Sequence, residues 1–154
     1  MPALAILLGI AGLAPFIGCG LGAMARDGEA DRMLAALIAY GAVMLAFLGG
    51  MQWGFALLAG NDARRQRWRL VLGVLPPLVG WLALLVALLA PGWFALAVLT
   101  AGFVGTALGE HRVAGQDPAI PSGYLWLRWA LTVAAAAMLI TVLMVRLLGV
   151  TISI

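Results

Sequence analysis

The sequence contains little charge and few of the residues that build reactive or metal-binding sites. Only 10% of its 154 residues are charged, whereas about a quarter are charged in a soluble domain. The single cysteine, Cys19, excludes an internal disulfide and a cysteine-rich metal site. One histidine and scattered methionines give no ligand spacing for a metal or haem, so we expect no metal and no cofactor. The sequence also has no nucleophile–base pairing and no phosphate-binding loop, which favours a protein that is not an enzyme.

Apolar residues are abundant instead and make up 65% of the chain. The charged residues gather in short patches, and long apolar runs separate them. Apolar runs of about 18 residues or more are typical of membrane-spanning helices. A helix suits this setting because it satisfies every backbone group within one segment. The sequence therefore predicts an all-α integral membrane bundle of five transmembrane helices in a single domain, 1–154. The predicted spans are approximately 3–25, 33–60, 70–90, 93–109 and 124–149.

The basic residues predict how this bundle is oriented. All nine are arginines, and the net charge is +3. Because these arginines lie in loops and at helix ends, we expect them to contact membrane lipids and not nucleic acid. Six arginines lie in or near the loops after the second and fourth predicted spans: Arg64, Arg65, Arg67, Arg69, Arg112 and Arg128. Positive charge favours the cytoplasmic side, so we expect the N-terminus inside and the C-terminus outside. Short loops without an arginine-rich amphipathic leader favour the bacterial inner (cytoplasmic) membrane.

Four segments of the sequence carry a family resemblance: 8–16, 40–54, 75–81 and 124–132. The most specific is the run Phe-Leu-Gly-Gly-Met-Gln-Trp-Gly at 47–54. With these segments the chain resembles domain of unknown function family 3429, a group of transmembrane protein 69-like small polytopic membrane proteins. The resemblance implies a five-helix membrane protein, and it brings no established activity or catalytic residues.

Several polar residues lie toward the predicted inner side of the spans. Polar groups at membrane depth are candidates for a functional site, and these residues could line a pocket for a polar headgroup or a quinone-like ring: Gln52, Trp53, Glu110, His111 and Arg128. The alternative is structural. Glu110 could pair with Arg112 or Arg128 to neutralise interfacial charge, Gln52 could form an interhelical hydrogen bond, and His111 could be an ordinary interfacial residue.

Glycine and proline mark further candidate positions. We expect helix hinges at Gly49, Gly50, Pro76 and Pro77, because glycine weakens a helix interior and proline removes a backbone donor. Three glycine pairs at a spacing of four residues suit close helix packing in lipid: Gly18 and Gly22, Gly50 and Gly54, and Gly105 and Gly109. At the outer interface we expect Arg146 to form a structural tie with the acidic residues of loop 26–32.

Three functions fit these features. The one we favour is a non-catalytic accessory or assembly component, or a lipid- or quinone-binding component, of a larger membrane complex. The alternative is a small oligomeric transporter or channel with an inner-side polar site, which the long second span and the prolines of the third favour. Five spans without an internal repeat argue against it. A lipid or quinone enzyme using Glu110 and His111 is disfavoured, because adjacent helical residues diverge by about 100°. The partners we expect are membrane lipids and a larger membrane complex or homo-oligomer.

Overall fold

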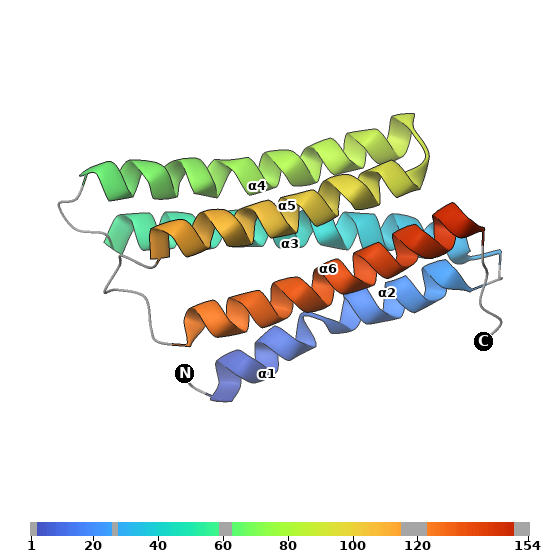
Figure 1. Ribbon diagram of the computed structural model, residues 1–154, viewed down its shortest axis with the longest axis horizontal. Helices are drawn as coiled ribbons and strands as arrows, with labels where there is room; N and C mark the ends of the chain where they lie inside the picture. Colours follow the sequence, from blue (N-terminus) through green and yellow to red (C-terminus); the bar gives the residue numbers. More distant parts are fainter. Residues whose placement is uncertain (1–2, 26–27, 59–62, 115–122, 150–154) are drawn as a thin grey trace.

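The computed structural model describes residues 3–25, 28–58, 63–114 and 123–149, and these ranges are almost wholly helical without a strand element. The six helices lie roughly along one common direction (Figure 1). Their bounds are α1 (Ala3–Ala11), α2 (Ala14–Met24), α3 (Ala30–Leu58), α4 (Ala63–Leu89), α5 (Gly92–Ala114) and α6 (Tyr124–Leu148).

Five apolar helical segments in this structure are long enough to cross a membrane, which confirms the predicted fold class. The first combines α1 and α2, and the other four are α3 to α6. The 29 residues of α3 extend about 43 Å, compared with about 30 Å for the hydrocarbon core of a bilayer. One or both ends of α3 therefore reach the headgroup region unless the helix tilts strongly.

Helix α3 lies at the centre of the bundle and packs against α2, α4 and α5. Its fully buried side chains include Leu37 and Leu45, which join Leu96 and Leu99 of α5 and Leu139 of α6 in one apolar core. In lipid this core gains little from hydrophobic exclusion, so close packing must hold the helices together.

The tightest packing is between the antiparallel helices α3 and α4, and glycine makes it possible. A Cβ atom placed on Gly80 would lie 2.9 Å from the carbonyl oxygen of Ala42, and one placed on Gly49 would lie 2.4 Å from the carbonyl oxygen of Gly73. Pro77 cannot donate the backbone hydrogen bond that the Gly73 oxygen would normally accept. The Gly49 backbone therefore approaches that oxygen directly, and the two helices touch backbone to backbone.

The first span is interrupted between α1 and α2, at Gly12 and Leu13. Sequence analysis predicted a continuous helix over 3–25. Pro15 has no backbone N–H, so it cannot continue the hydrogen-bond ladder to Ala11, and glycine one turn earlier weakens the helix further. The hydroxyl of Tyr40 in α3 donates to the carbonyl oxygen of Gly12 at 2.8 Å and holds the interruption in place.

The structure also differs from the prediction before the third span. Residues 64–69 were expected in a loop, but α4 begins at Ala63. Four arginines lower the local hydropathy without lowering helix propensity, because arginine is a good helix former. At the opposite end of the bundle the expected tie of Arg146 is present, since its Nη1 donates to Asp31 Oδ1 at 2.8 Å. The predicted loop residues 26–27, 61–62 and 115–122 lie outside the described residues, as do 59–60 at the end of the second predicted span.

Candidate functional site

A buried polar cluster joins four helices near the end of the bundle where α4 begins and α5 ends. It consists of Gln52 of α3, Arg69 of α4, Glu110 of α5, and Arg128 and Thr132 of α6. Each of these side chains is at least 95% shielded from solvent. Charged groups at this depth are costly unless they are paired and hydrogen-bonded.

Hydrogen bonds connect the cluster from one side of the bundle to the other. Arg69 Nη1 donates to the Gln52 side-chain oxygen at 3.2 Å, and Gln52 Nε2 donates to Glu110 Oε1. The second carboxylate oxygen, Oε2, accepts from Arg128 Nε at 2.6 Å. Arg128 Nη1 donates to the Thr132 hydroxyl, which in turn donates to the Arg128 carbonyl oxygen at 2.8 Å. Glu110 thus sits between the amide of α3 and the guanidinium of α6.

Aromatic rings flank this cluster. The Arg69 guanidinium lies over the Phe55 ring, 5.2 Å from the ring centroid, in cation–π geometry. The Phe55 ring meets the Tyr124 ring edge to face, with centroids 5.5 Å apart. Tyr124 lies one helical turn before Arg128 on α6 and interacts electrostatically with Glu110, Arg128 and Arg69. The rings exclude solvent and strengthen the electrostatic interactions inside.

Two buried groups of α6 make no hydrogen bond of normal geometry with the described residues. They are Nη2 of Arg128 and the hydroxyl of Tyr124, although the Glu110 carboxylate lies close enough to that hydroxyl to interact with it. Leaving a buried donor without a partner costs free energy, about 1–3 kcal/mol for a neutral group. Because the two residues are four positions apart on α6, they lie on one face of that helix.

Tyr124, Arg128 and Thr132 are the polar residues on the α6 side of an apolar groove of about 360 Å³. The interruption between α1 and α2 lies on its wall with Gly12 and Leu13. The rest of the lining is Leu8, Gly9, Phe16, Met44, Phe47, Leu48, Met51, Phe103, Leu127, Leu131 and Ala135. Leu8 and Phe47 are 63% and 60% exposed, so the groove borders the surface that faces lipid.

The structure brings together three of the five residues that the sequence suggested as pocket residues: Gln52, Glu110 and Arg128. Trp53 is adjacent to Gln52 in sequence but lies on the outer surface of α3 and α4, where its indole packs against Gly73. His111 is exposed, and its ring lies edge-on to Trp129 at 6.1 Å between centroids. Glu110 and His111 therefore do not converge, as the helical spacing indicated.

Sequence reasoning missed Arg69, Tyr124 and Thr132. Arg69 was assigned to a loop, although the spacing of small residues on α4 could have located it. Gly73, Pro76, Gly80 and Ala83 are all buried. They alternate at intervals of three and four residues, which marks one helix face. Continuing that face by one turn toward the N-terminus reaches Arg69.

The predicted hinge positions lie within unbroken helices. α3 continues through Gly49 and Gly50, and α4 continues through Pro76 and Pro77. Among the predicted packing glycines, Gly22 faces Met33 and Gly109 faces Leu72, with a built Cβ 2.6 and 2.8 Å from these side chains. No described side chain lies within 4 Å of a Cβ built on the remaining four: Gly18, Gly50, Gly54 and Gly105.

Comparison with known proteins identifies the family. The sequence profile of the family described as "Protein of unknown function (DUF3429)" matches residues 1–144. The chain belongs to this family. The DUF3429 chain is 36% identical to transmembrane protein 69 of Xenopus tropicalis over 139 residues, which cover 90% of this chain and 53% of that protein. It is 34% identical to transmembrane protein 69 of Mus musculus over 84 residues, or 54% of this chain and 34% of that protein.

The chain thus spans about half the length of the Xenopus tropicalis relative and a third of the Mus musculus relative. No solved structure matches it. The relatives' names describe transmembrane proteins, in agreement with the helical architecture.

Proposed function

We propose that this DUF3429 protein is a non-catalytic membrane component that binds one lipid- or quinone-like molecule in the groove between α1–α2, α3 and α6. The observation that carries the proposal is an apolar groove whose lining includes Arg128, with a buried and unpartnered Nη2, and Tyr124, with a buried hydroxyl. Binding pockets for small molecules are typically apolar with a few polar groups that orient the ligand.

The dimensions of the groove limit the size of the ligand. A cavity of about 150 Å³ in another protein holds one benzene ring, so 360 Å³ accommodates a ring with a short chain or part of one acyl chain. Met44 and Met51 line the groove, and their flexible thioether side chains suit ligands of varied shape. A two-chain phospholipid exceeds this volume unless most of it remains in the bilayer.

The polar residues of the groove limit the chemistry of the ligand. Nη2 of Arg128 and the hydroxyl of Tyr124 can both donate, so the matching ligand atom is an acceptor oxygen such as a quinone or ester carbonyl. Arg128 is already paired with Glu110, which makes the pair neutral overall. A neutral acceptor therefore suits these residues better than a second carboxylate would.

A thermal-shift titration tests the proposal. The probe is a decyl-substituted 1,4-benzoquinone added to the purified protein in mild detergent. We expect a saturable stabilisation that Leu131→Trp abolishes, because the larger ring fills the groove. Leu88→Trp is the matched control, since Leu88 is 81% exposed and does not line the groove. An equal shift in both variants and the wild type would place the probe elsewhere and refute the groove as its site.

We further propose that the protein lies in a bacterial inner membrane with its N-terminus inside. The described chain begins and ends at opposite ends of the bundle (Figure 1), as five spans require. Exposed basic residues gather where α4 begins and α5 ends, which suits the cytoplasmic side.

We also propose that the protein joins a larger complex through the outer surface of α3. Gly50 and Gly54 are exposed there beside Phe47 and Leu57, and an incoming helix could approach closely. Native mass spectrometry after gentle extraction from the source membrane tests this. A stoichiometric second protein supports the accessory role, whereas a chain that is alone at every protein concentration contradicts it.

One observation supports the transporter alternative: an interrupted span borders a groove whose lining includes the buried, charged Arg128. Discontinuous helices beside ionisable groups occur at transporter binding sites. Proteoliposomes that contain a pH-sensitive dye distinguish the two functions. Flux that depends on the protein and is lost in Glu110→Gln would favour transport over ligand binding alone.

A further inference from the structure

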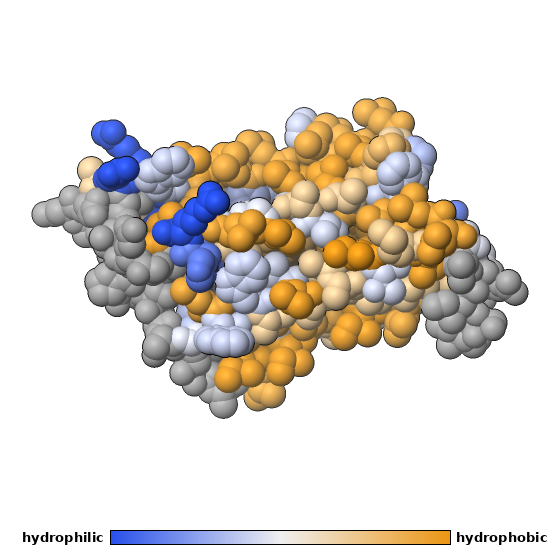
Figure 2. Space-filling view, viewed as in Figure 1, coloured by the Kyte–Doolittle hydropathy of each residue, from blue (hydrophilic) through white to orange (hydrophobic). Residues whose placement is uncertain are grey.

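The two ends of the bundle differ in how their exposed arginines are paired. Where α2 ends and α3 begins, Arg32 pairs with Glu29 at 2.6 Å, and Arg146 of α6 pairs with Asp31 at 2.8 Å. Where α4 begins and α5 ends, Arg64, Arg67 and Arg112 are exposed and make no ion pair or hydrogen bond with described residues. This end carries uncompensated positive charge among the described residues. Figure 2 shows strongly hydrophilic atoms gathered at the same end of the visible face, beside a largely hydrophobic middle.

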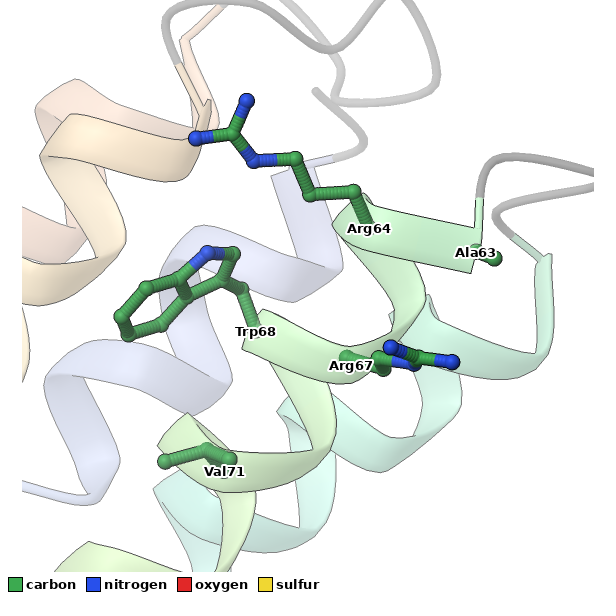
Figure 3. Close-up of a pocket in the computed structure, with 5 residues that line it drawn as sticks. All are labelled: Ala63, Arg64, Arg67, Trp68 and Val71. Atoms are coloured by element: carbon green, nitrogen blue, oxygen red, sulfur yellow. The ribbon is translucent and has the colours of Figure 1, made fainter.

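A shallow hollow lies on the first turns of α4 at this end. Its volume is about 550 Å³, and it is lined by Ala63, Arg64, Arg67, Trp68 and Val71. Arg64 and Trp68 extend to the same side of α4, whereas Arg67 extends to the other side (Figure 3). The Trp68 side chain is 55% exposed, and Val71 lies one turn further into the apolar part of the helix.

This combination of groups matches the boundary between a phospholipid headgroup and its acyl chains. Guanidinium groups donate several hydrogen bonds to phosphate oxygens, and the first backbone N–H groups of a helix favour an anion nearby. Tryptophan prefers the membrane interface, where one side of the ring is apolar and the other is polar. Val71 continues toward the hydrocarbon region. We propose that this hollow binds the headgroup of an anionic phospholipid, with Arg64 beside Trp68 donating to the phosphate and Arg67 adding positive charge from the other side of α4.

The lining of the hollow also indicates which phospholipids are selected. Among the described residues, its lining contains two cationic residues and no acidic residue. Choline or ethanolamine headgroups carry an ammonium group that would find no carboxylate here, so an anionic lipid is preferred over a zwitterionic one. The apolar contribution of Trp68 and Val71 favours a lipid over a free phosphate ion. This site is separate from the groove and goes beyond the proposed function, since it concerns how the protein is anchored in one leaflet.

Native mass spectrometry with competing lipids tests the proposal. The purified protein is titrated with an equimolar mixture of phosphatidylglycerol and phosphatidylcholine, and the ratio of the two retained lipids is measured. We expect the wild type to prefer phosphatidylglycerol. Each arginine near an anionic surface contributes about fivefold in affinity, so Arg64→Gln lowers the preference about fivefold, and the double variant with Arg67→Gln lowers it about 30-fold. The corresponding lysine variants retain most of it, because they keep the charge.

Arg32→Gln is the matched control, because Arg32 is also exposed but already paired with Glu29. It should leave the preference unchanged. Melting temperatures should be equal in all variants, since Arg64 and Arg67 make no ion pair or hydrogen bond with the described residues. The proposal is overturned if the double variant keeps the preference, or if Arg32→Gln lowers it as much. It also fails if inorganic phosphate binds at the hollow while phosphatidylglycerol shows no advantage over phosphatidylcholine.

Discussion

The chain has two tyrosines, and their hydroxyls are in opposite situations. The Tyr40 hydroxyl donates to the Gly12 carbonyl at 2.8 Å, whereas the Tyr124 hydroxyl lies near Glu110 without a hydrogen bond of normal geometry to the described residues. We expect Tyr40→Phe to lower the free energy of unfolding by about 1 kcal/mol, the value of one hydrogen bond. Tyr124→Phe should leave it unchanged or raise it slightly. Reversible unfolding in mixed micelles, followed by circular dichroism, measures both.

The same pair of variants separates stability from ligand binding. Tyr124→Phe should weaken binding of the decyl-benzoquinone probe by about two- to tenfold, because one hydrogen bond is lost. Equal destabilisation by the two variants, without an effect of Tyr124→Phe on the probe, would mean that the Tyr124 hydroxyl is a structural group.

Glu110 is the acceptor on which both the α3 and the α6 side of the cluster depend. Glu110→Gln leaves the Arg128 guanidinium buried without a carboxylate, and breaking a buried pair in this way costs about 3–5 kcal/mol. Glu29→Gln removes the carboxylate of an exposed pair and should cost less than about 1 kcal/mol. The same unfolding measurement compares the two. A loss below about 1 kcal/mol for Glu110→Gln would contradict the buried pairing described here.

At the scale of helices, the contact between α3 and α4 depends on adjacent glycines with opposite surroundings. A Cβ on Gly49 would lie 2.4 Å from the Gly73 oxygen, but a Cβ on Gly50 would meet nothing within 4 Å among the described residues. We expect Gly49→Ala to lower the free energy of unfolding by about 1–3 kcal/mol through overpacking. Gly50→Ala should leave it unchanged or raise it by up to about 1 kcal/mol through helix propensity.

Because the two substitutions are chemically identical and adjacent, effects on helix propensity cancel in their difference. Melting curves of both variants in the same detergent measure that difference. If Gly49→Ala melts at or above the temperature of Gly50→Ala, the backbone contact between α3 and α4 is not as close as the structure indicates.

The sequence predicted the helices better than the contacts between them. Apolar runs revealed five spans, because a membrane helix must be apolar over most of its length. The start of α4 was misplaced, since hydropathy measures preference for lipid and not for helix. The interruption at Gly12 and Leu13 was missed for a related reason: Pro15 breaks the hydrogen-bond ladder without changing the apolar character of the segment.

Part of the site could be predicted as well. Gln52, Glu110 and Arg128 stand out because polar residues within apolar spans are conspicuous. Arg69 did not stand out, since it belongs to a charged patch at the end of a span. Trp53 and His111 were grouped with the pocket because they lie at a similar predicted depth, but a neighbouring helical residue points about 100° away. The depth of a residue in the membrane does not show which way its side chain points. That direction depends on the rotational position of the residue around the helix axis.

At the scale of the whole molecule, one buried network connects α3, α4, α5 and α6 at the end where the exposed arginines are unpaired. The apolar groove joins this network from the α1–α2 side. At the opposite end, Arg32 and Arg146 form ion pairs at the surface, and such pairs contribute little to stability. The proposed groove ligand and the proposed lipid site therefore both lie toward one membrane face. The orientation of the bundle decides which face that is.

Cysteine labelling tests this orientation. In a Cys19→Ala background, Glu29→Cys and Arg112→Cys each place one exposed thiol at opposite ends of the bundle. With the N-terminus inside, a membrane-impermeant maleimide should label the Glu29→Cys protein in intact bacterial cells. It should label the Arg112→Cys protein only in inverted membrane vesicles, since that end then faces the cytoplasm. The reverse pattern would invert the proposed topology and move the hollow on α4 to the outer leaflet, where the cytoplasmic excess of arginine could no longer explain it.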